Sequence, residues 1–507
     1  MKKTQMLSVA AAALFLSSCE LIDDFIGDPV QPSSALKFTK VTAFSNGSGD
    51  EGFAEISAYD QKTKKLFVVN PNETEVSVWD ISNPQSASKL SGIALPATPN
   101  SVAVRDGLLA IAVENQDKQA DGSIITYDTE TMVAQNTYPA GALPDMVTFS
   151  PDGKYIVAAN EGEPNDDYTI DPEGSITVVD VEKNQVNTLY FSQFNGTVVG
   201  NDFRVFGPNA SLSMDVEPEY VAISDDSKYA YIALQENNGM AVVDLKAMTI
   251  SQLFGLGVKD FTKNGNTMDA SNRDNIIGNF KNWPVLSFYQ PDAITYATID
   301  GGGYIISANE GDARDYDGYS EEERVKDLLL DPVVFPNAGE LQKDENLGRL
   351  KTTTANGDID GDGDFDRIYG YGGRSFTIWN THGGLVYDSG DDIGRRTFEI
   401  NATLFNNDEG EADGRSDDKG SEPEAVATLE LEDGSVLLFV GLERTGGAMV
   451  YDISNPYAPE FVEWLVDASD VGPEGLLVIP AKESPSGENL LVLTHEVSNT
   501  ISIYEIK

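Results

Sequence analysis

The chain of 507 residues contains one cysteine, Cys19, and two histidines, His382 and His495. A single cysteine forms no disulfide within the chain and no thiolate metal site, so the hydrophobic core must hold the fold together. Two histidines supply no zinc ligand cluster, and no Gly-x-Ser-x-Gly motif points to a serine nucleophile. We expect His495 to lie beside acidic strand ends and His382 to lie in an outer loop.

Basic residues are also scarce, because 34 Lys and Arg stand against 83 Asp and Glu, for a net charge of −49. Binding to nucleic acid phosphates requires dense Lys and Arg, so the composition argues against a nucleic acid partner. The charge suits a soluble protein in a cation-rich extracellular setting. Residues 301–303 are three glycines that predict a hairpin turn, since neither a lysine nor a helix follows as in a phosphate-binding loop.

Long hydrophobic runs are absent except near the N-terminus, where residues 6–16 are apolar. This run follows Met1-Lys2-Lys3 and is too short to span a bilayer as a mature helix. Residues 16–19, Leu-Ser-Ser-Cys, resemble the lipobox of bacterial lipoproteins. The resemblance implies a signal peptide at 1–18, lipid attachment at Cys19 and a flexible tether at 19–36, with an outer-membrane location favoured by the residue after the cysteine. The alternative is an ordinary secretory signal.

A unit of three short strands organises the rest of the chain. In its clearest copy, the strands are residues 220–224, 229–234 and 240–243, and the turns between them are rich in Asp, Asn, Ser and Gly. Apolar runs bounded by such turns are typical of antiparallel strands joined by hairpins.

This unit recurs seven times, and a polar or acidic residue stands at the start of each first strand. The first two spacings between these residues are both 45. A repeat of about 40–50 residues that carries several strands is typical of a β-propeller. We therefore predict an all-β fold, a seven-bladed β-propeller over residues 37–507 with long loop insertions; the alternative is a β-sandwich. The seven leading residues are Glu55, Asn100, Asp145, Glu219, Asp292, Glu424 and Glu474.

The last unit has only three clear strands, whereas residues 38–44 form a strand pattern with no unit of their own. We predict that this N-terminal strand pairs with the C-terminal blade, closes the ring and removes its open edges. The expected insertions are residues 182–216, 246–290, 310–375 and 388–421. The third is expected to contain a helix at 320–330 that starts with a capping box.

The third insertion also carries an aspartate-rich loop. Carboxylates at every second residue, with glycines between them, resemble the calcium loop of an EF-hand, although position twelve is Tyr369 instead of Glu. We predict a calcium site here; the alternative is an acidic turn without a ligand. The predicted metal ligands are Asp358, Asp360, Asp362, Asp364 and Asp366.

A second acidic group follows from the repeat itself. In a propeller the first strands line the central channel and the second strands return to the same face, so acids at these positions should form a ring at one channel mouth. Such a ring would bind cations or raise the pKa of its members; the alternative is a structural network that fixes blade packing. Its expected members are Glu55, Asp145, Glu161, Glu219, Glu236, Asp292, Glu310, Glu424, Glu443, Glu474 and Glu496, with Arg314, Arg374 and Arg444 as ion-pair or anion-binding partners.

Four stretches carry a family resemblance: residues 309–316, the segment from the aspartate-rich loop to residue 376, residues 415–424 and residues 441–444. Together they resemble the choice-of-anchor I family of bacterial surface and secreted propellers, some of which are labelled alkaline phosphatase-like. The resemblance implies a surface module that reaches the cell exterior through an anchor. Together with the lipobox-like segment and the aspartate-rich loop, it leads us to expect a lipid-anchored, calcium-binding monomer whose partner is a surface protein, polysaccharide or phosphoester. The alternative is a calcium-dependent phosphoesterase. Trp283 and Trp464 are candidate glycan contacts, whereas Trp79 and Trp379 are expected in the core.

Overall fold

The computed structural model describes residues 36–49, 52–408 and 410–507, and Lys37–Lys507 form a compact unit. The predicted signal peptide at 1–18, the lipidation site Cys19 and the tether up to residue 35 lie outside the described residues.

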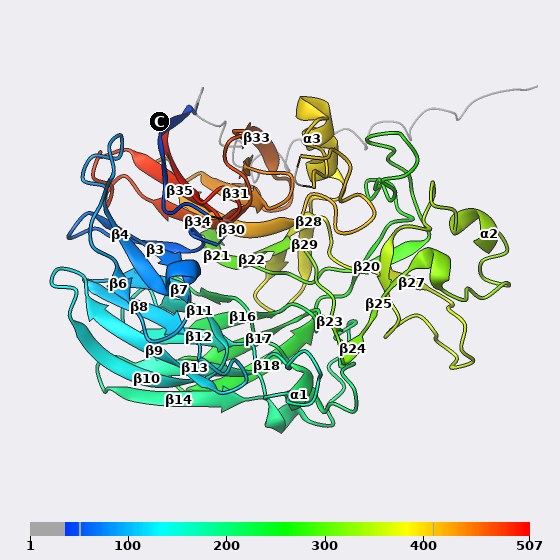
Figure 1. The fold of residues 1–507 in the computed structure, drawn as a ribbon, viewed down its shortest axis with the longest axis horizontal. Helices are drawn as coiled ribbons and strands as arrows, with labels where there is room; N and C mark the ends of the chain where they lie inside the picture. The colour runs from blue at the N-terminus through cyan, green and yellow to red at the C-terminus, as the bar shows by residue number, and fades with distance from the viewer. Residues whose placement is uncertain (1–35, 50–51, 409) are drawn as a thin grey trace, which may run out of the picture. The chain divides into compact units, whose positions relative to one another are not determined.

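The unit of residues 37–507 is built mainly from seven antiparallel sheets, numbered here 1 to 7 (Figure 1). Sheets 1 to 3 consist of β2 (Ser57–Asp60), β3 (Lys65–Asn70), β4 (Glu75–Asp80) and β5 (Ser88–Lys89) with β6 (Ile93–Ala94); β7 (Pro99–Arg105), β8 (Leu108–Val113), β9 (Asp121–Asp128) and β10 (Ala134–Ala142); and β11 (Pro144–Phe149), β12 (Tyr155–Asn160), β13 (Ser175–Asp180) and β14 (Gln185–Tyr190). Sheets 4 and 5 consist of β15 (Val221–Ile223), β16 (Tyr229–Leu234), β17 (Gly239–Asp244) and β18 (Thr249–Gly255); and β21 (Ile294–Ile299), β22 (Gly302–Asn309), β28 (Ser375–Asn380) and β29 (Leu385–Asp388). Sheets 6 and 7 consist of β30 (Pro423–Glu430), β31 (Val436–Leu442), β32 (Ala448–Asp452) and β33 (Glu460–Leu465); and β34 (Pro473–Ile479), β35 (Asn489–His495), β36 (Thr500–Ile506) and β1 (Phe38–Ser45).

The predicted all-β class and strand repeat are confirmed. In sheet 4 the predicted second strand coincides with β16, and the hairpin to β17 pairs Tyr229 with Asp244 and Leu234 with Gly239. Sheets 1 to 6 each add an outer strand that the sequence pattern did not define, whereas the fourth strand of sheet 7 is the predicted N-terminal strand, β1.

Neighbouring sheets share hydrophobic cores because successive residues of a strand face opposite sides. Along β3, Phe67 and Val69 belong to a core with sheet 2, whereas Leu66 and Val68 belong to a core with sheet 7. The first strands contact one another in the order β2, β7, β11, β15, β21, β30 and β34, and β34 contacts β2 again. The arrangement is propeller-like.

The predicted pairing of the two ends of the unit is also present. β1 runs antiparallel to β36, from Phe38 opposite Ile506 to Ser45 opposite Thr500. The backbone N–H of Lys37 donates to the carbonyl of Lys507 at 2.8 Å, and the N–H of Lys507 donates back at 3.1 Å. Sheet 7 therefore combines three C-terminal strands with one N-terminal strand.

The insertions of the middle units fold together around a hydrophobic core of their own. Its sheet contains β19 (Val258–Asp260), β20 (Val285–Phe288) and β27 (Ile368–Gly370), and β20 and β27 run parallel. Apolar side chains from residues 261–368, Phe261, Trp283 and Phe335 among them, fill this core. We call residues 258–288 and 321–370 the insertion lobe, which lies at the right of Figure 1.

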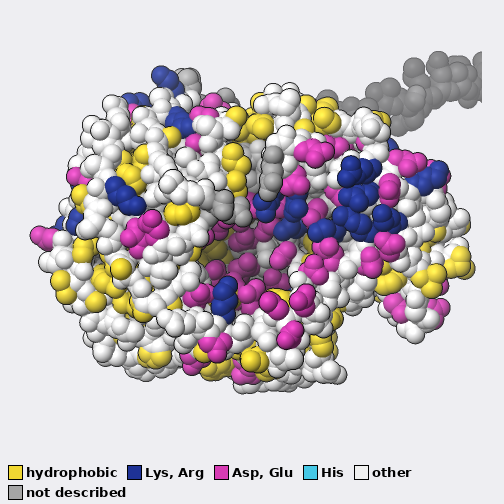
Figure 2. All heavy atoms as spheres, in the orientation of Figure 1, with side chains coloured by type: hydrophobic (Ala, Val, Ile, Leu, Met, Phe, Trp, Pro, Cys, Tyr) yellow, Lys and Arg dark blue, Asp and Glu magenta, His cyan; other side chains and the backbone are white. Residues whose placement is uncertain are grey.

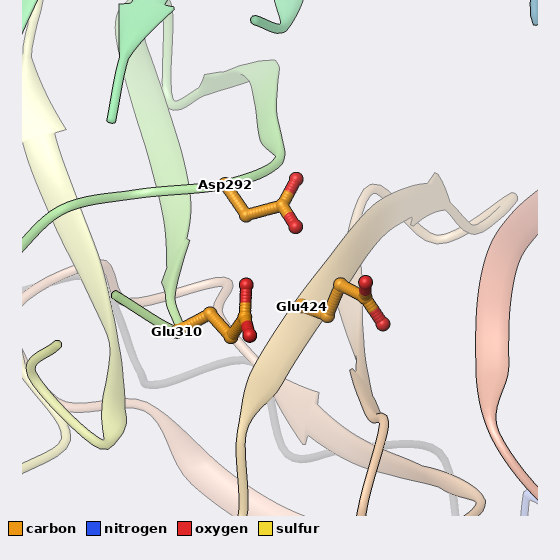
Figure 3. Close-up of side chains that lie close together, drawn as sticks. All are labelled: Asp292, Glu310 and Glu424. Carbon is orange, nitrogen blue, oxygen red and sulfur yellow. The ribbon is translucent and has the colours of Figure 1, made fainter. Parts of the chain in front are cut away.

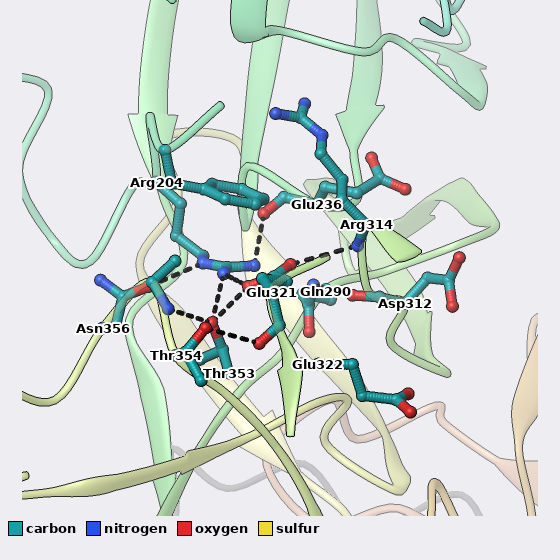
Figure 4. A network of polar contacts seen from close by, with 12 residues as sticks. Arg204, Glu236, Gln290, Asp312, Arg314, Glu321, Glu322, Thr353, Thr354 and Asn356 are labelled. Atoms are coloured by element: carbon teal, nitrogen blue, oxygen red, sulfur yellow. Dashed lines mark hydrogen bonds and ion pairs between the residues drawn. The ribbon is translucent and has the colours of Figure 1, made fainter. Parts of the chain in front are cut away.

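The helix predicted at 320–330 is wrong. The segment contains β24 (Tyr319–Ser320), which pairs with β23 (Asp315–Tyr316), then β25 (Glu322–Arg324) and a 3-10 turn, η3 (Val325–Asp327). β25 pairs with β26 (Lys351–Thr353). Glu321 is fully buried and accepts hydrogen bonds from Arg204 and Thr353 (Figure 4), so its tertiary partners override the local helix signal.

Helices are few in the described part of the chain. They are α1 (Leu212–Asp215), α2 (Ala338–Leu341) and α3 (Asp392–Asn401), with short 3-10 turns η1 (Pro71–Glu73) and η2 (Ser192–Phe194) besides η3. None of the helices among these residues combines the length and the apolar character that crossing a membrane requires.

Candidate metal centre

Acidic side chains gather where the first strands begin and the second strands end. Antiparallel pairing brings these ends together, because Pro144 lies opposite Asn160 and Pro423 lies opposite Leu442. A cavity of about 140 Å³ opens there, and Figure 2 shows a hollow lined with Asp and Glu side chains in the middle of this face. Five predicted ring members line the cavity: Glu55, Asp145, Asp292, Glu424 and Glu474. We call this end of the unit the mouth.

The other predicted acids lie close enough to influence these five. The pKa of Glu219 is raised by burial and then by Asp292, Glu236 and Glu161. Glu496 contributes to the raised pKa of Glu55 and Glu474. The structure therefore brings both predicted sets, at strand starts and strand ends, into one electrostatic group.

Three carboxylates lie close together at the mouth (Figure 3). Asp292 precedes β21, Glu310 follows β22 and Glu424 lies in β30, and one oxygen from each lies within 4.8 Å of the others. The backbone holds this arrangement, since Asp292 N–H donates to the carbonyl of Ala308 and Ala293 N–H donates to the carbonyl of Glu424. We call Asp292, Glu310 and Glu424 the first carboxylate group.

Glycine is required where Glu310 leaves its strand. Gly311 and Gly372 both have positive φ, at 88° and 70°. A Cβ on Gly311 would lie 2.1 Å from the backbone nitrogen of Gly372, and a Cβ on Gly372 would lie 1.9 Å from the carbonyl oxygen of Glu310. The close approach of these two backbones places the Glu310 side chain at the mouth.

A second set of three carboxylates adjoins the first and shares Glu310 with it. Glu310, Glu422 and Glu443 are all buried, and one oxygen from each lies within 4.8 Å of the others. We call these residues the second carboxylate group. Basic side chains contact it: Lys419 lies 2.5 Å from Glu310, Arg415 lies 2.6 Å from Glu422, and Arg444 lies 2.8 Å from Glu443.

Burial favours the protonated form of the mouth carboxyls by raising their pKa values. Burial raises the pKa of Glu55 and Glu443 to about 9, and of Glu474 to about 8. For Asp292 and Glu424 the pKa is raised first by burial and then by neighbouring carboxylates. A bound divalent cation would reverse this effect, because a nearby positive charge favours the ionised form.

The three predicted arginine partners behave differently. Arg444 pairs with Glu443, a predicted ring member. Arg314 instead pairs with Asp215 at 2.6 Å and with Glu217 at 3.0 Å. Arg374 donates hydrogen bonds to the backbone carbonyls of Asp269, Ser416 and Asp418 and so supports the segment that carries Lys419.

Sequence reasoning assigned no task to Glu217, Glu422 or Lys419. A signal for the two acids was present, since Glu217-Pro-Glu219 and Glu422-Pro-Glu424 are the same pattern in two units. Lys419 has no such signal, because its contact with Glu310 joins segments 109 positions apart.

The aspartate-rich loop lies in the insertion lobe, between β26 and β27. Its acids separate into two sets of three that share Asp366: one contains Asp358 and Asp360, and the other contains Asp364 and Asp331, which the sequence did not indicate. The Asp364 pKa is raised to about 6, first by burial and then by Asp362. Asp362 belongs to neither set and accepts a hydrogen bond from the N–H of Asp364.

His382 is exposed in a turn after β28, as expected, whereas His495 and the tryptophans are buried. His495 is buried beside Asp470 at 3.7 Å, and burial lowers its pKa to about 4. All four tryptophans are buried, which makes the expectation of glycan contacts at Trp283 and Trp464 wrong.

The fold and the mouth define a class: an acidic, propeller-like, all-β protein with clustered carboxylates at one end. The profile of the Choice-of-anchor I domain matches residues 55–456, and the chain belongs to that family. Membership indicates an extracellular surface protein.

Comparisons with individual proteins give more distant matches. Gigasin-3a of Magallana gigas is 28% identical over 192 residues, which cover 33% of this chain and 67% of that protein. A chain of Kuenenia stuttgartiensis hydrazine synthase matches with a TM-score of 0.49 at 14% identity, covering 91% of this chain and 97% of its own. A chain in a crystal structure of the mitotic checkpoint complex matches with a TM-score of 0.48 at 12% identity, covering 98% and 99%.

Proposed function

We propose that this protein is a surface binding module that holds calcium at the mouth of a closed seven-bladed propeller. The observation that carries the proposal is the first carboxylate group, Asp292, Glu310 and Glu424: one oxygen from each lies within 4.8 Å of the others, and Asp292 and Glu424 line the cavity. Calcium prefers several oxygen ligands, and the mouth offers carboxylates without sulfur or imidazole. Calcium bound at the mouth, and at the aspartate-rich loop, stabilises the surface that meets a partner protein, polysaccharide or phosphoester.

A titration of the full chain with calcium, followed by calorimetry, tests the mouth site. Glu424→Gln keeps the size of the side chain but removes one ligand charge. We expect it to weaken one class of calcium site at least about tenfold, which corresponds to about 1.4 kcal/mol. Glu130→Gln is the matched control, because Glu130 is 65% exposed in a pair with Lys62 and should leave calcium binding unchanged. Equal affinities in the two variants would contradict calcium binding at the mouth.

We further propose that the module is a monomer attached to the bacterial cell envelope, in the outer membrane, through lipid on Cys19. The support is the lipobox-like sequence at residues 16–19, together with membership of a family of surface proteins. Cys19→Ser should release the protein from the membrane fraction into the soluble fraction. Retention of the variant in the membrane would argue against the lipid anchor.

A calcium-dependent phosphoesterase is the second candidate. The observation that favours it is a lysine, Lys419, and an arginine, Arg444, beside the carboxylate groups, since basic groups next to a metal ion stabilise a transferring phosphoryl group. Phosphate release from p-nitrophenyl phosphate with calcium, lost in Glu310→Gln, would support the enzyme. A flat assay with a calcium-raised melting temperature would support the binding module alone.

A further inference from the structure

The second carboxylate group contains a buried oxygen without a hydrogen bond. Glu422 is 0% exposed, and its Oε2 accepts no hydrogen bond, although Arg415 donates to its other oxygen at 2.6 Å. Arg444 Nε lies 3.5 Å from Oε2 and is likewise without an acceptor. The two atoms form an ion pair that is too long for a hydrogen bond, so the buried Oε2 of Glu422 has no hydrogen-bond donor, although buried polar atoms normally have one.

Other polar atoms without partners lie on the segments that carry Glu422 and Arg444 or on a segment bonded to them. Asn407 donates to the carbonyl of Arg444, but its own Oδ1 accepts nothing. The hydroxyl of Thr445 and the Oε2 of Glu424 also have no hydrogen-bond partner. Several such atoms on neighbouring segments indicate one shared ligand rather than separate irregularities.

The resident basic side chains do not satisfy the Oε2 of Glu422. Lys419 lies 2.5 Å from Glu310 and 3.5 Å from Asp312, but 3.9 Å from Glu422 Oε2. Arg415 also forms an ion pair with Asp418. The two groups therefore contain five carboxyl groups beside three basic side chains.

We propose that the mouth holds two divalent cations joined by Glu310, the first on Asp292, Glu310 and Glu424 and the second on Glu310, Glu422 and Glu443. The first cation is the one in the proposed function, and the second rests on it. Ligands that are all carboxylates select oxygen-preferring ions such as Ca²⁺ or Mn²⁺. In known two-metal sites the ions lie about 3.5–4 Å apart, which one carboxylate can bridge. Lys419 is the counter-ion that the second cation replaces on Glu310.

Manganese is the probe, because two Mn²⁺ ions that share a carboxylate give a spin-coupled electron paramagnetic resonance spectrum, whereas separate ions give six-line spectra. The full chain carries Asp366→Asn as background, since Asp366 belongs to both sets of acids in the aspartate-rich loop. We expect two Mn²⁺ per chain at the mouth and a coupled spectrum.

Single variants then assign the ions. Glu422→Gln should reduce binding to one Mn²⁺ with an uncoupled spectrum, and Glu443→Gln should do the same without disturbing the Arg415 pair. Lys419→Met should tighten the second ion about tenfold or more, because it removes the competing charge. Asp312→Asn is the control, since Asp312 contacts Lys419 but belongs to neither group.

The outcomes separate this inference from the proposed function. A single uncoupled ion that is lost in Glu424→Gln and unaffected by Glu422→Gln would overturn the second cation and leave the proposed function standing. A coupled pair that survives both Glu422→Gln and Glu443→Gln would overturn the assignment of ligands. No Mn²⁺ bound in the Asp366→Asn background would overturn both.

Discussion

At the scale of single residues, the ionisation of the mouth carboxyls links stability to pH. A glutamate in the unfolded chain titrates near 4.5, whereas burial raises the folded pKa of Glu443 to about 9 and of Glu474 to about 8. Between these values the folded protein holds more protons, so the free energy of unfolding is highest below pH 4.5 for these groups and falls as pH rises through 8 to 9. The melting temperature in chelator should therefore fall from pH 5 to pH 9.

Calcium should flatten that dependence, because the cation replaces the protons. In saturating calcium we expect a smaller fall in melting temperature over the same pH range, and the Glu443→Gln variant in chelator should also show a weaker pH dependence than the parent chain. Parallel curves with and without calcium would place the titrating groups away from the cation.

The same carboxyls predict proton release on calcium binding. Burial raises the pKa of Asp145 and Glu236 to about 7, so near neutral pH part of the mouth is protonated before a cation arrives. Calcium affinity should rise from pH 6 to pH 9, and calorimetry in buffers of different ionisation enthalpy should detect released protons near pH 7. An affinity independent of pH would show that calcium binds only elsewhere.

Individual site residues could be predicted where they recur, and not where they depend on long-range packing. Glu310 follows a second strand and Glu424 begins a first strand, and both positions recur in the repeat, so the repeat alone indicated them. Lys419 and Asp331 lie in insertions without a repeat, and each meets its acidic neighbours only through the fold. The sequence contains no local pattern that predicts these long-range contacts with acidic side chains.

At the scale of elements, the insertion lobe is attached through a buried ionic network (Figure 4). Arg204 is 2% exposed; it bonds Glu321 and the carbonyl of Glu236, and its guanidinium lies 3.9 Å from the ring centre of Phe206. Arg204→Met would leave Glu321 buried without its counter-ion, which we expect to destabilise the protein by about 3–5 kcal/mol in denaturant unfolding.

The matched control for Arg204→Met is Lys62→Met, which removes an ion pair that is 65% exposed on both sides and should cost less than about 1 kcal/mol. The double variant Arg204→Met/Glu321→Met should recover part of the loss, since it leaves no unpaired charge. An Arg204→Met effect as small as that of Lys62→Met would mean that the network contributes little.

Strands and helices could be predicted from the sequence where a short, local pattern of residues determines them. The hairpin of β16 and β17 follows from apolar runs and Asn-Gly turns that are legible within 30 residues. The 320–330 segment has a good local helix signal, yet Glu321 is drawn into the Arg204 network and β25 into pairing with β26. The hydrophobic core of the insertion lobe combines segments that are remote in sequence, so no periodic sequence pattern predicted it.

At the scale of the whole molecule, the proposed closed ring depends on β1. This strand gives sheet 7 its fourth strand, and it also brings Lys40 to Asp467 and Asp470, each at 2.7 Å. Without β1, the edge of β36 would expose unpaired backbone groups, which is the condition that favours aggregation.

Two truncations of the chain test this dependence. Removal of residues 1–36 should leave the melting temperature unchanged, because the compact unit begins at Lys37. Removal of residues 1–45 should lower it by about 10 °C or more, since one lost kcal/mol corresponds to about 2–4 °C in a large domain. Lys40→Met separates the two contributions of β1, because it removes the ion pairs and keeps the strand. If Lys40→Met alone matches the longer truncation, the ion pairs hold the two ends together; if the longer truncation melts like the shorter one, the ring does not need β1 to close.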